Sequence, residues 1–388
     1  MPRPGATALV VCLLALAGAA AASAATGPAV DAPSAPALLV AGAFADGSLL
    51  ALDATGRRLA SGAGEGRALD VAVCPGGRRA AESIDRGDGS AAVAIRALPG
   101  LEAVRELPAP GAGPIACLDE AGDEVAVLGL VPGGSSSLVR IGADGTPATL
   151  WSGPAVAGTL TTTRAAITAG AEGDRLVVVD LATGSVRDLG ELPAGAGPLA
   201  QGPGERLAGV RAPADDLSQA LLVEPRGTGI RSRGSDLDQA LATGRALWVT
   251  DRQFVVVTVN PLQDVRLYDV DLQRGEAFGG WNGAVAAAAR GCLLYGIDRE
   301  DGLRVAALPD GPVRNLGTLD GQVEALVAVD PPAPSDLALG CAEQLEAVAA
   351  GAPEDRGLGT GLTILVGVAV FGLAILAGIA GRRAARRW

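Results

Sequence analysis

The stretch LVVVDLATGSVRDLG, residues 176–190, decides the fold. It joins an apolar, valine-rich run to an Asp-x-x-Thr-Gly turn and then to a second strand-like run. Seven apolar runs along the chain lead into a glycine turn of this kind, at Gly56, Gly100, Gly145, Gly184, Gly227, Gly275 and Gly311. The intervals are 44, 45, 39, 43, 48 and 36 residues, with a mean of 42.5. This period is typical of four-stranded propeller blades, so the sequence predicts an all-β, seven-bladed β-propeller over residues 37–330, with six or eight blades as the alternative.

The two ends of this region are complementary. Residues 37–61 supply only the outer strands of a blade, and residues 323–330 form a lone strand after the seventh turn. Joining them completes one blade from both chain ends, which closes the ring and removes exposed sheet edges.

The repeat resembles the bacterial β-propeller repeat proteins of the WD-repeat-like and YVTN-like type. The resemblance rests on the inner-strand sequences GGRRAAES, GDEVAVLG and GERLAGVR and on the turn in VVVDLATG. It covers roughly residues 37–330 and is architectural only, because the Trp-Asp and Gly-His dipeptides of true WD repeats are absent. It therefore implies a fold and no functional residue.

The segments outside the repeat predict export and a membrane anchor. Residues 1–25 have a positive start, an apolar centre and an Ala-Ser-Ala cleavage site, as a signal peptide does, and residues 26–36 form a linker. Residues 362–380 are 19 uncharged residues, long enough to span a bilayer as one helix, and the basic tail 381–388 marks the cytoplasmic side. We therefore expect a single-pass cell-membrane protein with its bulk extracytoplasmic. An uncleaved anchor and a buried core helix are the alternatives for the two segments.

The charge between these segments excludes some partners. The two hydrophobic ends hold five arginines and no acidic residue, which leaves 26 basic and 43 acidic residues between them, a net charge of −17. Nucleic acid and anionic lipid surfaces are poor partners for such a region.

The four cysteines of the outer region predict two disulfides. Cys74 and Cys117 fall in the same column of the repeat, on matching strands of adjacent blades, so we expect them to pair. Cys292 and Cys341 are then left to each other. Residues 331–361 are expected to hold a short helix and a juxtamembrane linker. Leu337, Cys341, Leu345 and Val348 share one face of that helix.

Catalytic motifs are scarce. The chain has no histidine, so it has neither a Ser-His-Asp or Cys-His pair nor an imidazole ligand, and no phosphate-binding loop follows a strand. Acidic groups such as Asp298, Glu300 and Asp301 do not match a calcium loop, and solvated turns explain them better. We expect no catalytic residue, no metal and no cofactor.

The aromatic residues suggest a contact surface. Six of the ten fall between residues 248 and 295, and Trp281, Trp248 and Tyr295 are the candidates for contact with a partner. Trp281 lies among loop residues in GGWNGA and is expected to be exposed. The sequence thus favours a protein-binding or scaffold module in the cell envelope rather than an enzyme. The alternative is a carboxylate-based hydrolase or lyase with its site at the mouth of the propeller channel.

Overall fold

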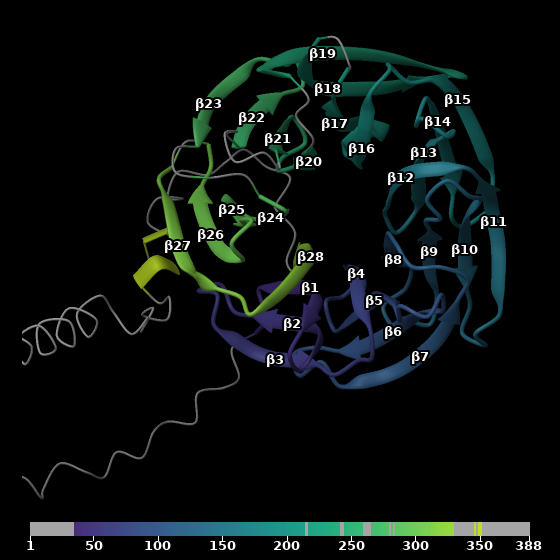
Figure 1. Ribbon diagram of the computed structural model, residues 1–388, viewed down its shortest axis with the longest axis vertical. Coiled ribbons are helices and arrows are strands. Elements are labelled where there is room, and N and C mark those ends of the chain that lie inside the picture. The colour runs from purple at the N-terminus through teal and green to yellow at the C-terminus, as the bar shows by residue number, and fades with distance from the viewer. Residues whose placement is uncertain are drawn as a thin grey trace, which may run out of the picture. The chain divides into compact units, whose positions relative to one another are not determined.

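Seven four-stranded antiparallel sheets follow one another around a ring (Figure 1). The computed structural model describes residues 35–213, 216–240, 244–258, 265–278, 281, 284–309, 311–329, 345–346 and 348–350. The protein is therefore an all-β, seven-bladed propeller, and the alternatives of six or eight blades are wrong. Within the described residues no helix is long and apolar enough to cross a membrane. The predicted signal peptide, membrane span and basic tail lie outside those residues.

The strands of each blade are numbered here from the ring axis outward. Blade 1 contains β28 (Gly321–Ala328), β1 (Leu38–Phe44), β2 (Gly47–Leu52) and β3 (Arg58–Gly62). Blade 2 contains β4 (Arg67–Val73), β5 (Arg79–Asp85), β6 (Ala91–Ala97) and β7 (Ala103–Ala109). Blade 3 contains β8 (Ile115–Cys117), β9 (Val125–Gly129), β10 (Ser136–Ile141) and β11 (Pro147–Gly153). Blade 4 contains β12 (Ala155–Leu160), β13 (Arg164–Ala169), β14 (Arg175–Asp180) and β15 (Val186–Glu191).

The remaining three blades follow the same order. Blade 5 contains β16 (Ala196–Gln201), β17 (Leu207–Arg211), β18 (Leu217–Arg226) and β19 (Gly229–Ala240), with the short 3₁₀ helix η1 (Pro203–Glu205) between its first two strands. Blade 6 contains β20 (Gly244–Trp248), β21 (Gln253–Thr258), β22 (Val265–Asp269) and β23 (Arg274–Phe278). Blade 7 contains β24 (Ala286–Arg290), β25 (Leu293–Ile297), β26 (Gly302–Ala307) and β27 (Val313–Thr318).

The ring closes as the two chain ends predict. The last strand, β28, pairs with β1 along its whole length, from Leu38 opposite Ala328 to Phe44 opposite Gly321. One blade thus takes its innermost strand from the end of the propeller sequence and its other three from the start. The edge of β1 facing the ring axis is covered by this pairing.

The glycine period marks one connection in each blade, that between the third and fourth strands. At Gly184 the backbone has φ of 72°, a value that glycine adopts without steric cost. Asp180 fixes the same turn, because its Oδ1 accepts hydrogen bonds from the backbone N and Oγ1 of Thr183 at 2.7 and 2.8 Å. Six of the seven glycines lie in this connection, and Gly275 is the exception, since it lies inside β23. In blade 6 the turn is formed by residues 269–273, and Leu272 has the positive φ, 62°.

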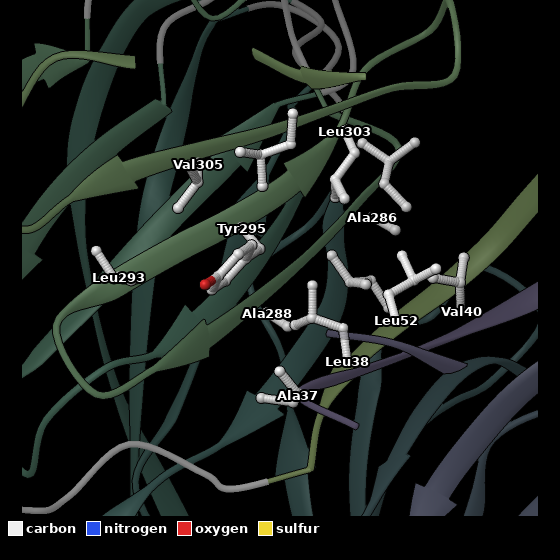
Figure 2. Packing of buried hydrophobic residues seen from close by; sticks show 14 of the residues in the cluster. Ala37, Leu38, Val40, Leu52, Ala286, Ala288, Leu293, Tyr295, Leu303 and Val305 are labelled. Carbon is white, nitrogen blue, oxygen red and sulfur yellow. The ribbon is translucent and has the colours of Figure 1, made fainter. Parts of the chain in front are cut away.

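The core lies between blades rather than within one layer. Each inner sheet is covered by a neighbour on both faces, so strands such as β9 and β25 are buried at every residue. Figure 2 shows the cluster between blades 7 and 1, where the fully buried Tyr295 lies near Leu38 and Leu52. Its hydroxyl donates to the carbonyl oxygen of Ala54 in blade 1 at 3.1 Å. Burial on both faces explains why alternation of polar and apolar residues is weak in the sequence.

The disulfide prediction is confirmed for the first pair. Cys74 and Cys117 are joined, with their Cα atoms 4.8 Å apart, at matching ends of the inner strands of blades 2 and 3. Cys292 is also disulfide-bonded. Its predicted partner, Cys341, lies outside the described residues, so that pairing stays a prediction.

Part of the predicted short helix is described. Residues 345–346 and 348–350 are helical. Leu345 is 1 % exposed and packs in the same cluster as Cys292, with Val348 partly buried against it. Arg314 of β27 pairs with Glu346 at 2.6 Å.

Candidate functional site

All seven inner strands begin on the same face of the ring. Because the chain reverses at every hairpin and link, β28, β4, β8, β12, β16, β20 and β24 run in one direction along the ring axis (Figure 1). We call the face on which they begin the entry face. The links between blades and the turns between second and third strands lie on it. The disulfide of Cys74 and Cys117 lies at the opposite face, where inner strands end.

Polar residues gather on three inner strands near the entry face. Arg67 and Asp70 lie on β4, Gln322 and Glu324 on β28, and Arg245 on β20, and we call these five residues the rim cluster. The Nη2 of Arg67 donates to Oε1 of Glu324, and Nε2 of Gln322 donates to the same oxygen at 3.0 Å. Arg245 is exposed and lies close enough to Asp70 to stabilise its charge. Opposite charges from blades 1, 2 and 6 thus converge on the inner rim.

β-Bulges set the direction of these side chains. In blade 1, Val323 pairs with Gly42 and Ala325 with Ala41, which leaves Glu324 as the extra residue of β28. Leu69 is the extra residue of β4 at the corresponding place. A bulge leaves its residue out of the regular alternation and redirects the side chain. The carboxylate of Glu324 is thereby placed to meet Arg67 of the neighbouring blade.

Asp70 occupies a position that is apolar in other blades. It is the first paired residue after the bulge, and the corresponding residues are Ala325, Ala157 and Leu199, all buried. Its carboxylate is only partly exposed and accepts a hydrogen bond from the backbone N of Ile115 at 3.0 Å. Desolvation by burial raises the pKa of Asp70 from 3.8 to about 6, and the Ile115 hydrogen bond, the backbone N of Val71 and Arg245 oppose that rise.

This arrangement can take up and release a proton near neutral pH. A carboxyl group with a pKa of about 6 is ionised at pH 7 and still basic enough to accept a proton from water or from a substrate hydroxyl. Arg245 forms no hydrogen bond with another residue in the part that the structure describes, so its guanidinium remains available to an anion. Arg67 is committed to Glu324 instead.

A pocket of about 530 Å³ adjoins the rim cluster on the entry face. It lies between blades 7 and 1 and shares Gln322 with the cluster. This volume falls within the range of small-molecule sites. Its lining residues are Val285, Asp298, Arg299, Asp301, Gly321, Gln322 and Val323.

The acidic loop of this pocket is not the solvated turn that the sequence favours. Asp298 is 3 % exposed, and its Oδ1 accepts the backbone N atoms of Glu300 and Gly302 at 2.9 and 2.8 Å. Its Oδ2 pairs with Arg304 at 2.7 Å. Asp301 has φ of 60°, and desolvation, followed by the charge of Asp298, raises its pKa. Within the described residues no group of three or more acidic or cysteine side chains could hold a metal.

The expected aromatic contact surface is wrong. Trp281 is 3 % exposed, Trp248 9 % and Tyr295 0 %, so none of them presents a ring to a partner. Each tryptophan fills a slot that a glycine of the neighbouring blade leaves open. A Cβ on Gly296 would lie 2.3 Å from Trp281, and one on Gly202 would lie 2.1 Å from Trp248. The indole N of Trp248 also donates to the carbonyl oxygen of Ala200 at 3.1 Å.

The rim cluster was not anticipated from the sequence, although a signal for it exists. GRALDVAV and GQVEALVA both begin at a glycine with positive φ, Gly66 and Gly321, that precedes the inner strand. Aligning these glycines places Asp70 opposite Ala325 and Arg67 opposite Gln322. An acid in an apolar column of a repeat is the anomaly that this alignment would have revealed.

Comparison with known proteins supports the fold alone. No family model matches the chain, and no curated protein does. Among solved structures, the chain is similar to a "putative 6-phosphogluconolactonase" from Bacteroides uniformis ATCC 8492, with a TM-score of 0.59 and 14 % identity over 76 % of this chain and 99 % of the other. It is also similar to a "putative 6-phosphogluconolactonase" from Bacteroides fragilis NCTC 9343, with a TM-score of 0.53 and 14 % identity over 76 % and 98 % of the two chains.

Proposed function

We propose that the protein is a carboxylate-based hydrolase of small esters or lactones, with Asp70 as the proton acceptor on the entry face. The observation that carries the proposal is the placing of Asp70. An ionisable group stands in an apolar column of the repeat, its pKa is about 6, and Arg245 lies beside it. Perturbed acids of this kind concentrate at functional sites. The names of the two similar structures, both lactonases, agree with the reaction class and do not add a residue to it.

The proposed reaction uses two side chains of the rim cluster. The ionised Asp70 takes a proton from a water molecule while the water oxygen attacks the ester carbonyl carbon. The carbonyl oxygen becomes an oxyanion, which Arg245 stabilises by charge and hydrogen bonding. When the carbon–oxygen bond to the leaving alcohol breaks, the protonated Asp70 returns its proton to that alkoxide. The products are a carboxylic acid and an alcohol, or one hydroxy acid from a lactone.

Hydrolysis by matched variants tests this proposal. The full chain, Asp70→Asn and Asp88→Asn are assayed with 4-nitrophenyl acetate and with γ-butyrolactone in a pH-stat. Asp88 is an exposed acid in a turn of the same face and serves as the control. We expect Asp70→Asn to lower kcat/KM by about 100-fold or more and Asp88→Asn to leave it unchanged. Equal activity of the two variants would refute the assignment of Asp70.

The acid limb of the pH profile gives a second test. Only the ionised carboxylate can accept the proton, so kcat/KM should fall about tenfold per pH unit below about pH 6. A profile that is flat from pH 5 to 8 would show that another group performs the step.

We also propose that this site lies outside the cell, on a propeller tethered by the 362–380 segment. The sequence of both ends supports this location, and the Cys74–Cys117 disulfide is in keeping with an oxidising compartment. Alkaline phosphatase fused after residue 388 should be inactive, whereas a fusion after residue 355 should be active. A protein partner in the envelope is the second-ranked function, because the aromatic surface on which it was based is buried.

A further inference from the structure

The inner rim of the propeller is divided into a charged half and an uncharged half. The inner strands of blades 3, 4 and 5 read IAC, AVAGTL and AGPLAQ and hold no charged residue. The links that lead into them, such as PGAGP at residues 110–114, are uncharged as well. The rim cluster lies on the inner strands of blades 6, 1 and 2. The two halves face each other across the ring axis (Figure 1).

Exposed apolar side chains gather over the uncharged half. Five large hydrophobic residues of the described chain are exposed, and three of them lie on the entry face of consecutive blades. Val131, 45 % exposed, follows β9 in blade 3; Val156, 48 % exposed, lies on β12 in blade 4; and Leu217, 38 % exposed, begins β18 in blade 5. The other two, Val104 and Val186, lie on the outer strands near the opposite face.

Val156 lies at the same depth as the charged half. In β12, Ala155 pairs with Ala169 and Ala157 with Thr168, so Val156 is the extra residue of a bulge. That is the position of Glu324 in blade 1. The apolar side chain is therefore a counterpart of a rim-cluster carboxylate, three blades away. Pro198, in the corresponding irregular stretch of β16, is exposed too.

We propose that the substrate carries a straight acyl chain, whose ester carbonyl lies at Asp70 and Arg245 and whose methylene groups lie over Val156 toward Val131 and Leu217. This inference rests on the proposed hydrolase. The charged half suits the polar reacting group, and an uncharged half without lysine, arginine or acid on its inner strands suits hydrocarbon. Exposed apolar residues spread over three blades suit an extended chain better than a compact ring.

Chain length should therefore set the catalytic efficiency. Each methylene that becomes buried contributes about fourfold in binding, so kcat/KM should rise from 4-nitrophenyl acetate through the butyrate to the hexanoate. The full chain is compared with Val156→Asp and with Val186→Asp, a matched control with similar exposure on another part of the surface. All three are prepared in the same amphipol, so that partitioning of the esters cancels in the ratios.

The expected result is loss of the chain-length dependence in Val156→Asp alone, with the acetate still hydrolysed. Leu217→Asp provides a second variant if Val156→Asp is poorly folded by circular dichroism. An unchanged dependence in both variants would overturn the proposal. So would a membrane protein captured by the full chain and lost with Val156→Asp while the ester series stays unaffected, since that identifies a protein as the occupant.

A binding measurement separates this inference from the hydrolase itself. Saturation-transfer NMR with hexanoate and acetate needs no turnover. If no ester is hydrolysed but the hexanoate methyl signal is lost in Val156→Asp and kept in Val186→Asp, the acyl site stands and the hydrolase fails. If hexanoate and acetate behave alike in the full chain, the acyl site is refuted whatever the activity.

Discussion

Replacing Asp70 with asparagine should stabilise the fold at neutral pH. The carboxyl group has a pKa of 3.8 in an unfolded chain and about 6 in the fold, so the folded state binds its proton more tightly. Below about pH 4 both states hold the proton and folding carries no penalty. As pH rises through 6 the folded state must lose a proton that it holds more tightly than the unfolded state does, and stability is lost.

The size of the effect follows from the two pKa values. A difference of about two units, each worth about 1.4 kcal/mol, gives a penalty of about 3 kcal/mol at pH 8. At pH 4 the same relation gives about 0.5 kcal/mol. Asparagine keeps an oxygen that can accept the backbone N–H of Ile115 and never carries the charge, so the variant should avoid the penalty.

Urea denaturation at pH 8 and pH 4 measures this difference directly. We expect Asp70→Asn to be more stable than the native chain at pH 8 and nearly equal at pH 4. Asp88→Asn is the control with the opposite sign, because its hydrogen bonds from Ser90 lower the pKa of that acid. A stabilisation of equal size at both pH values, or none at pH 8, would show that Asp70 is not held against its charge.

Three further substitutions test the packing. Removing the Cys74–Cys117 disulfide by a double change to serine should lower the free energy of unfolding by about 4 kcal/mol for a loop of 43 residues, measured against the reduced native chain as control. Arg96→Met should cost about 3–5 kcal/mol, because Glu82 at 0 % exposure would then be buried without its cation, and adding Glu82→Gln should recover much of the loss. Trp281→Ala should lower the thermal stability by an amount equivalent to about 3–5 kcal/mol and should not act through a partner, which capture from membranes can check.

The fold could be predicted because its determinants are local and repeated. The Asp-x-x-Thr-Gly turn at Gly184 specifies its own geometry through Asp180 and Thr183, and the same connection recurs in every blade. The pairing of Cys74 with Cys117 follows once the repeat is aligned. Gly275 was misplaced by a few residues because in blade 6 Leu272, a non-glycine residue, takes the positive φ.

The site could not be predicted in the same way because it is assembled across blades. Asp70 looks like an ordinary polar residue in the strand LDVAV, and only its neighbours from blades 3 and 6, Ile115 and Arg245, define its environment. Trp281 fails for a related reason. Its flanking glycines indicate a loop, whereas its burial depends on Gly296, which opens the slot from the next blade.

The closure of the ring by β28 and β1 also has a consequence for biogenesis. The inner edge of β1, ending at Phe44, has no partner until Gly321 and the residues after it have been synthesised. At about 5–20 residues per second, the intervening chain takes roughly 15–60 s to make. Throughout that time an apolar strand edge is open to pairing with another chain. The six later blades can form in order, whereas the first waits for the last strand, so the ring becomes safe from misassembly only at the end of its synthesis.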